Sequence, residues 1–91
     1  MVQIERKVRG GKLVRVDVQF MEGRIASIRI TGDFFMHPED AIIEIERRMV
    51  GLHKDNIAEG VAEVFSSVNA EIVGFTPSDI SDMISEAIDD A

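Results

Sequence analysis

The sequence predicts an α+β domain in which a three-stranded antiparallel sheet precedes three helices that pack on one of its faces. Two patterns predict this fold class. Residues 2–31 alternate apolar and polar side chains with a period of two, which is typical of half-buried strands. Residues 38–91 instead repeat apolar side chains at steps of three and four, as amphipathic helices do. Strands followed by helices are the segregated pattern of α+β domains.

Length and composition restrict the class of protein. The 91 residues suit a single domain covering residues 1–91, and a hydrophobic content of 45% favours a folded core. Because the chain has no cysteine, it has no disulfide, thiolate metal site or cysteine nucleophile. No apolar run approaches the ~20 residues that span a bilayer, and the charged, strand-like beginning is unlike a signal peptide. We therefore expect a cytoplasmic protein that does not enter a membrane.

Charge is divided unevenly along the chain. Residues 1–32 carry seven basic and three acidic residues, a net charge of +4, whereas residues 33–91 carry three and fourteen, a net charge of −11. The overall charge of −7 disfavours general binding to nucleic acid, which depends on neutralising phosphates. The predicted strands nevertheless carry basic side chains that could face an acidic partner. A face that meets only solvent is the alternative and the commoner situation. The basic side chains are Lys7, Arg9, Arg15 and Arg29.

Strands are expected at residues 2–9, 12–20 and 24–31. Gly10-Gly11 and Met21-Glu22-Gly23 predict the two turns between them. In the second strand the apolar face consists of Val14, Val16, Val18 and Phe20. In the third strand the alternation predicts that Ala26, Ile28 and Ile30 face the core and that Ile25 faces the opposite side.

Helices are expected to begin at Pro38, at Asp55 or Asn56, and at Thr76-Pro77. Proline is tolerated in the first turn of a helix, and Gly51 is a typical end for the first one. Thr76 and Asp79 have the spacing of a capping box. The apolar residues 70–75 have no assignment.

Residues 31–40 join the two layers and are the first place to look for function. Phe34 and Phe35 cannot both point into one core from a strand, because successive side chains face opposite ways. At least one therefore packs against the helices or a partner; packing of both at the corner is the alternative. His37 is the better placed of the two histidines, but no base and orienting group accompany it. Since the sequence also lacks zinc, phosphate-loop and nucleophile motifs, we do not expect an enzyme on its own.

Taken together, several motifs resemble the small accessory domain of lipoate–protein ligases. They are Gly11-Lys12-Leu13, Glu22-Gly23-Arg24-Ile25, and Thr31-Gly32-Asp33-Phe34-Phe35 followed by Pro38-Glu39. In many members this domain is the C-terminal part of one ligase chain, and in others, notably archaeal ones, it is a separate protein. The resemblance extends to the helix that begins at Thr76, and the chain length matches the separate arrangement.

The resemblance implies a heterodimer with a large catalytic subunit. That subunit is expected to hold lipoate and ATP with magnesium, whereas this chain binds no cofactor alone and supplies no catalytic residue. The small subunit is needed to form lipoyl-AMP and meets the lipoyl acceptor domain only indirectly. The implied partner contact is at Gly32, Asp33, Phe34 and Phe35, with His37 nearby. Gly32 would allow a turn or a close approach, Asp33 would hydrogen-bond, and one phenylalanine would be a buried anchor.

Two alternatives come from other classes of protein. The family domain is similar in fold to iron–sulfur scaffold and sulfur-acceptor proteins, which suggests cluster assembly or sulfur transfer. Those proteins work through cysteines, and this chain has none. The other alternative is a generic acidic adaptor without a link to lipoate.

Overall fold

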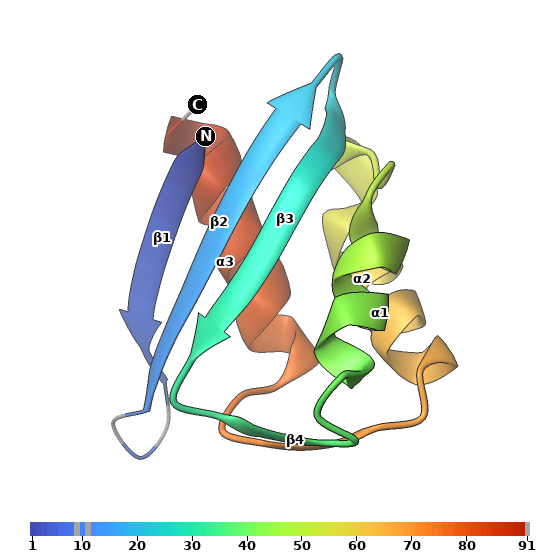
Figure 1. Cartoon of the computed structure of the whole chain (residues 1–91). Coiled ribbons are helices and arrows are strands. Elements are labelled where there is room, and N and C mark those ends of the chain that lie inside the picture. The colour runs from blue at the N-terminus through green and yellow to red at the C-terminus, as the bar shows by residue number, and fades with distance from the viewer. Residues whose placement is uncertain (9, 11, 91) are drawn as a thin grey trace.

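The computed structural model describes residues 1–8, 10 and 12–90, and it has an α+β fold (Figure 1). A three-stranded sheet lies on one side, and all three α-helices lie on the other. The strands are β1 (Val2–Lys7), β2 (Leu13–Met21), β3 (Arg24–Gly32), β4 (Phe35–His37) and β5 (Glu71–Val73). The helices are α1 (Ala41–Met49), α2 (Ile57–Ser67) and α3 (Pro77–Asp90), with a short 3₁₀ helix at Lys54–Asn56. Because β5 lies between α2 and α3, the expected order of all strands before all helices is wrong.

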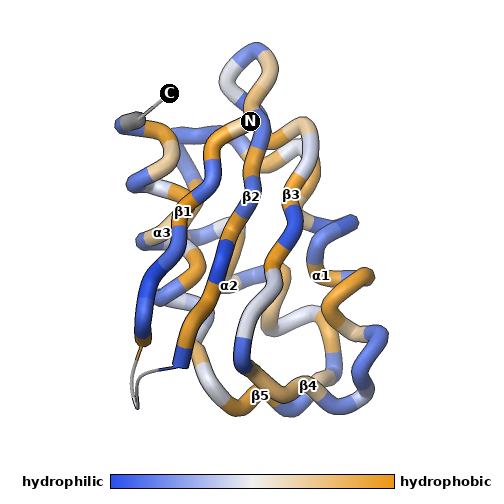
Figure 2. The backbone as a smooth tube through the Cα atoms, turned by 60° about the vertical axis from the view of Figure 1, so that its left-hand side comes forward, coloured by the Kyte–Doolittle hydropathy of each residue, from blue (hydrophilic) through white to orange (hydrophobic). Residues whose placement is uncertain are grey.

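The large sheet is the predicted antiparallel meander, in the order β1-β2-β3. Its alternation of apolar and polar residues is visible along each strand (Figure 2). Gly10 and Gly23 have φ angles of +74° and +77°, as the two turns require. Gly11 and the predicted end of the first strand at Arg9 lie outside the described residues. The inner face of β2 is fully buried through Val14, Val16 and Val18.

A bulge in β3 contradicts part of the predicted alternation. Gln19 pairs with Ser27 and Phe20 pairs with Ile25, so Ala26 has no partner on β2. One extra residue reverses which side chains face the core. Ile25 is therefore only 1% exposed while Ala26 is exposed, the opposite of the prediction.

The free edge of β3 is closed by the chain that follows α1. The Ile25 N–H donates to the Leu52 carbonyl at 3.0 Å, and the Gly51 N–H donates to the Ile25 carbonyl at 2.8 Å. Further along the strand, the Ile30 N–H donates to a Glu46 carboxylate oxygen at 2.7 Å. These bonds fix α1 against the sheet, because each satisfies an edge group that would otherwise face solvent.

The predicted helices form, and α1 begins later than expected. The Ala41 N–H donates to the Pro38 carbonyl at 3.0 Å, so Pro38 belongs to a turn and not to the helix. The capping box is confirmed: the Asp79 N–H donates to the Thr76 hydroxyl at 3.2 Å, and the Thr76 N–H donates to the Asp79 carboxylate at 2.8 Å. The repeat of apolar side chains at steps of three and four corresponds to buried helix faces, which contain Ile45, Met49, Ile57, Val61, Val64, Ile80, Met83, Ile84 and Ala87.

The residues without an assignment form a second sheet. β5 pairs antiparallel with β4, with Phe35 opposite Val73, Met36 opposite Ile72 and His37 opposite Glu71. The two strands lie side by side at the end of the large sheet where β3 leaves it (Figure 2). This small sheet closes that end of the domain. None of the helices in the described part of the chain is long and apolar enough to cross a membrane.

Candidate functional site

The outer face of the small sheet exposes two apolar side chains side by side. Met36 points into the core, whereas its neighbours on β4 point outward, as alternation requires. Phe35 is 73% exposed and its cross-strand partner Val73 is 58% exposed. Isolated exposed hydrophobic residues are ordinary, whereas adjacent ones form an apolar patch of the kind that a partner can cover. We call the outward side chains of this sheet, Phe35, His37, Glu71 and Val73, the corner face.

A groove of about 560 Å³ lies beside the corner face. We call it the corner groove; its lining residues are Gly10, Lys12, Gly32, Asp33, Phe34 and Phe35. Four of the residues expected at the partner contact therefore line this groove, namely Gly32, Asp33, Phe34 and Phe35. The fifth, His37, lies on the adjoining corner face.

Gly32 allows the chain to leave the sheet at the groove. Its φ is +141°, and a Cβ there would lie 2.2 Å from the Leu13 carbonyl oxygen. The next residue uses the same carbonyl, since the Asp33 N–H donates to it at 2.8 Å. The close backbone approach expected of Gly32 is present, and no other residue type fits without moving β2.

The two phenylalanines have different environments. The Phe34 ring packs edge-on against Phe75, with ring centroids 4.9 Å apart, and Phe75 in turn packs against Phe65 at 5.9 Å. A Cβ at Gly74, the residue after β5, would lie 2.9 Å from the Cβ of Phe34, so this packing also needs a glycine there. Phe34 thus holds the corner together, and Phe35 is the one available to a partner.

Asp33 and His37 are both exposed, and neither forms an ion pair with any described residue. His37 lies opposite Glu71. No group of three or more metal-ligating side chains gathers anywhere in the described ranges. The corner therefore offers hydrogen bonding, charge and apolar contact.

Val73, Glu71 and Lys12 are members of this surface that the sequence did not identify as site residues. A three-residue strand is too short to show a period of two, so nothing local pointed to β5. Lys12 stands in a quoted motif, but its place in the groove depends on how the first hairpin meets the end of β3.

Among the residues that the structure describes, the open face of the large sheet carries both basic and acidic side chains. Arg15 donates to the Glu5 carboxylate at 2.8 Å, and Asp17, opposite Arg29, accepts from Gln3 at 2.7 Å. Arg9 lies outside the described residues.

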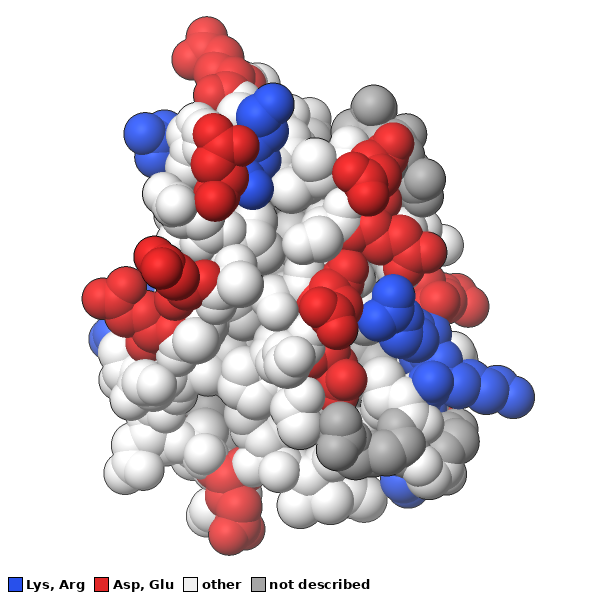
Figure 3. Space-filling model, turned by 180° about the vertical axis from the view of Figure 1, so that it is seen from behind, with Lys and Arg blue, Asp and Glu red and all other residues white. Residues whose placement is uncertain are grey.

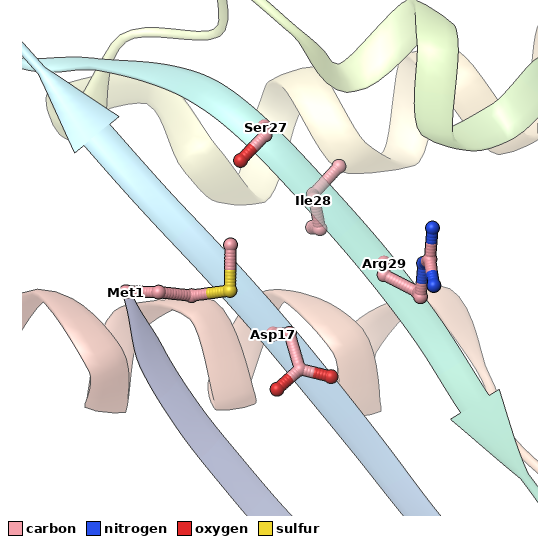
Figure 4. Close-up of a pocket in the computed structure, with 5 residues that line it drawn as sticks. All are labelled: Met1, Asp17, Ser27, Ile28 and Arg29. Carbon is pink, nitrogen blue, oxygen red and sulfur yellow. The ribbon is translucent and has the colours of Figure 1, made fainter.

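A second hollow of about 370 Å³ lies on this face, beside Asp17, Ser27 and Arg29 (Figure 4). The Ser27 hydroxyl is buried without a hydrogen-bond partner among the described residues. None of the expected site residues lines this hollow.

The opposite, helical side of the molecule is predominantly acidic. Acidic residues surround an uncharged centre there and outnumber the basic ones in view (Figure 3). A shallow hollow between α2 and α3 is lined by small side chains such as Ala58, Ala62 and Ser81. The exposed apolar pair Phe35 and Val73 lies on the small sheet and not in this hollow.

Comparison with known proteins points to lipoate ligases. The family described as bacterial lipoate protein ligase C-terminus matches residues 1–84. Lipoate-protein ligase A subunit 2 of Thermoplasma acidophilum is 35% identical over 54 residues, which are 59% of this chain and 57% of that protein. The match thus spans little more than half the length of this relative.

Among solved structures, a similar chain comes from an archaeal lipoylation system of Thermoplasma acidophilum, a bi-partite lipoate protein ligase and its E2 lipoyl domain. The TM-score is 0.72 at 26% identity, covering 91% of this chain and 97% of that chain. These comparisons give no support to the expected likeness to iron–sulfur scaffold proteins. Since the family match extends over most of the chain and the fold agrees, the chain belongs to the family of lipoate protein ligase C-terminal domains and small subunits.

Proposed function

We propose that this chain is the non-catalytic subunit of a two-component lipoate–protein ligase. It acts with a large catalytic subunit to convert lipoate and ATP into lipoyl-AMP, before the lipoyl group is transferred to a lysine of an acceptor domain. The observation that carries this proposal is the family match over residues 1–84, supported by the likeness to a chain of a bi-partite ligase.

The corner face is the part of the molecule best suited to the catalytic subunit. Aromatic side chains dominate the energetics of protein interfaces, and Phe35 is an exposed aromatic with an exposed apolar neighbour, Val73. Burying this pair removes apolar surface from water without disturbing the core, because Phe34 and Met36 hold the strand from the other side.

ATP, its magnesium ion and lipoate belong to the catalytic subunit in this proposal. The contribution of the small chain is then to order loops around the adenylate and to keep water from a reactive mixed anhydride. Closing lids have this role in other enzymes. The acceptor domain is met by the catalytic subunit and only indirectly by this chain.

The test is lipoyl-AMP formation by the purified large subunit of the same organism, with and without this chain. We expect product only when both are present, and an equal amount of the unfolded chain serves as control. Transfer from synthetic lipoyl-AMP to the acceptor domain is measured in parallel and should proceed with the large subunit alone. Equal lipoyl-AMP formation in the absence of this chain would contradict the proposal.

A further inference from the structure

The corner groove differs in chemistry from the corner face beside it. Its lining is more polar than apolar, and Lys12 is its one cation among the described residues. The Lys12 ammonium is exposed and forms no ion pair with a described residue. Four arginines do have carboxylate partners, namely Arg6, Arg15, Arg47 and Arg48. Lys12 is thus a cation available for an external anion.

The rest of the lining suits a phosphate group. Gly10 presents backbone without a side chain, and the space a Cβ would take there is open, so a ligand can approach the main chain closely. Asp33 is the acidic residue of the lining, and its carboxylate repels a phosphate chain that carries no metal ion. A phosphate chain that carries magnesium avoids this conflict, because its metal attracts the carboxylate while its oxygens attract the ammonium.

We propose that Lys12 contacts the phosphate chain of a magnesium-complexed nucleoside triphosphate that the catalytic subunit holds. This inference rests on the proposed function. Phe35 belongs to both the corner face and the corner groove, so docking through the corner face places the groove against the catalytic subunit. The volume of about 560 Å³ accommodates a phosphate chain, and the polar lining disfavours an apolar acyl chain.

The test uses the reconstituted two-subunit ligase with the Lys12→Ala and Lys12→Arg variants. The KM for ATP and the kcat of lipoyl-AMP formation are measured, and the Kd of the two subunits is measured separately. Losing one charge-assisted contact should raise the KM for ATP about tenfold in Lys12→Ala, with an unchanged subunit Kd. Lys12→Arg should stay near the wild-type KM because the charge is kept.

Lys7→Ala is the matched control. Lys7 is an exposed lysine at the end of β1 and does not line the groove, so its removal makes the same charge change elsewhere. We expect an unchanged KM for ATP in this variant.

Four outcomes overturn the inference, and the fourth also overturns the proposed function. If the KM for ATP is unchanged in Lys12→Ala, Lys12 does not contact the nucleotide. The same conclusion follows if the KM rises as much in Lys7→Ala as in Lys12→Ala. If Lys12→Ala raises the Kd of the two subunits and leaves the KM for ATP unchanged, Lys12 contacts a carboxylate of the catalytic subunit instead of the nucleotide. These results leave the proposed function in place, provided that lipoyl-AMP formation depends on this chain. Equal formation without the chain overturns both proposals.

Discussion

Phe34 and Phe35 are adjacent in the chain but have opposite environments. Phe34 is half-buried and meets Phe75 edge-on at 4.9 Å, whereas Phe35 is 73% exposed. The sequence predicts that adjacent phenylalanines on a strand face opposite ways. It could not tell which one faces the core, because the answer depends on Phe75, far away in the chain.

Alanine at each position should separate the two roles. Phe34→Ala should lower the free energy of unfolding by ~2–3 kcal/mol, since it removes a ring packed against the core. Phe35→Ala should change it by less than ~0.5 kcal/mol but weaken binding to the catalytic subunit by ~2 kcal/mol or more. Urea unfolding and titration calorimetry measure the two quantities.

Met21→Ala is the control, because Met21 is 63% exposed at the turn between β2 and β3. It should leave both quantities unchanged. If Phe35→Ala unfolds as easily as Phe34→Ala, Phe35 belongs to the fold, and the corner face loses its anchor.

Glu44 offers a prediction on pH at the same scale. The hydrogen bond from Arg48, 2.8 Å long, lowers the pKa of Glu44, and the charges of Arg47 and Arg48 add to this while partial desolvation opposes it. A lowered pKa stabilises the fold above the ordinary pKa of glutamate, and this stabilisation is lost as the pH falls through the lowered pKa.

In Arg48→Ala the pKa of Glu44 should therefore rise toward its ordinary value. An NMR titration of the Glu44 carboxyl group in both proteins measures this change. An unchanged midpoint would show that Arg48 is not the main cause.

At the scale of elements, the bulge in β3 explains why the faces of Ile25 and Ala26 were predicted the wrong way round. Ile25 and Ala26 are adjacent and both apolar, so an alternation beginning at either one fits the sequence. No glycine or proline marks the extra residue in the strand. Which of the two faces the core depends on residues outside the strand, because the backbone groups of Ile25 are hydrogen-bonded to those of Gly51 and Leu52. Strands without such an irregularity, such as β2, were predicted with the correct face.

The bulge predicts a sharp difference between two neighbouring substitutions. Ile25→Ala should lower the free energy of unfolding by ~2–5 kcal/mol, because it leaves a cavity at a fully buried position. Ala26→Ser should change it by less than ~0.5 kcal/mol, because Ala26 is exposed. Thermal and urea unfolding measure both variants. The reverse order of sensitivity would restore the simple alternation and rule out the bulge.

At the scale of the whole molecule, local patterns predicted the layers but not the small sheet. Periodicity identified the three strands of the meander and the three helices, and the Thr76 cap was correct because capping is a local interaction. β5 has only three residues, and its partner β4 lies before two helices. The candidate site was accordingly predicted only from residues 32–37: Phe35 was included, and Val73, which pairs with it, was not.

The pairing of β4 with β5 also has a consequence for the order in which parts of the domain fold. Phe35 and Val73 are 38 positions apart in the chain, whereas the meander closes over short turns. Contacts between distant segments form late, because a long loop must first be closed. We therefore expect the corner face to form only after α1 and α2 have docked on the sheet. A partner that binds there selects finished molecules and leaves incompletely folded ones unbound.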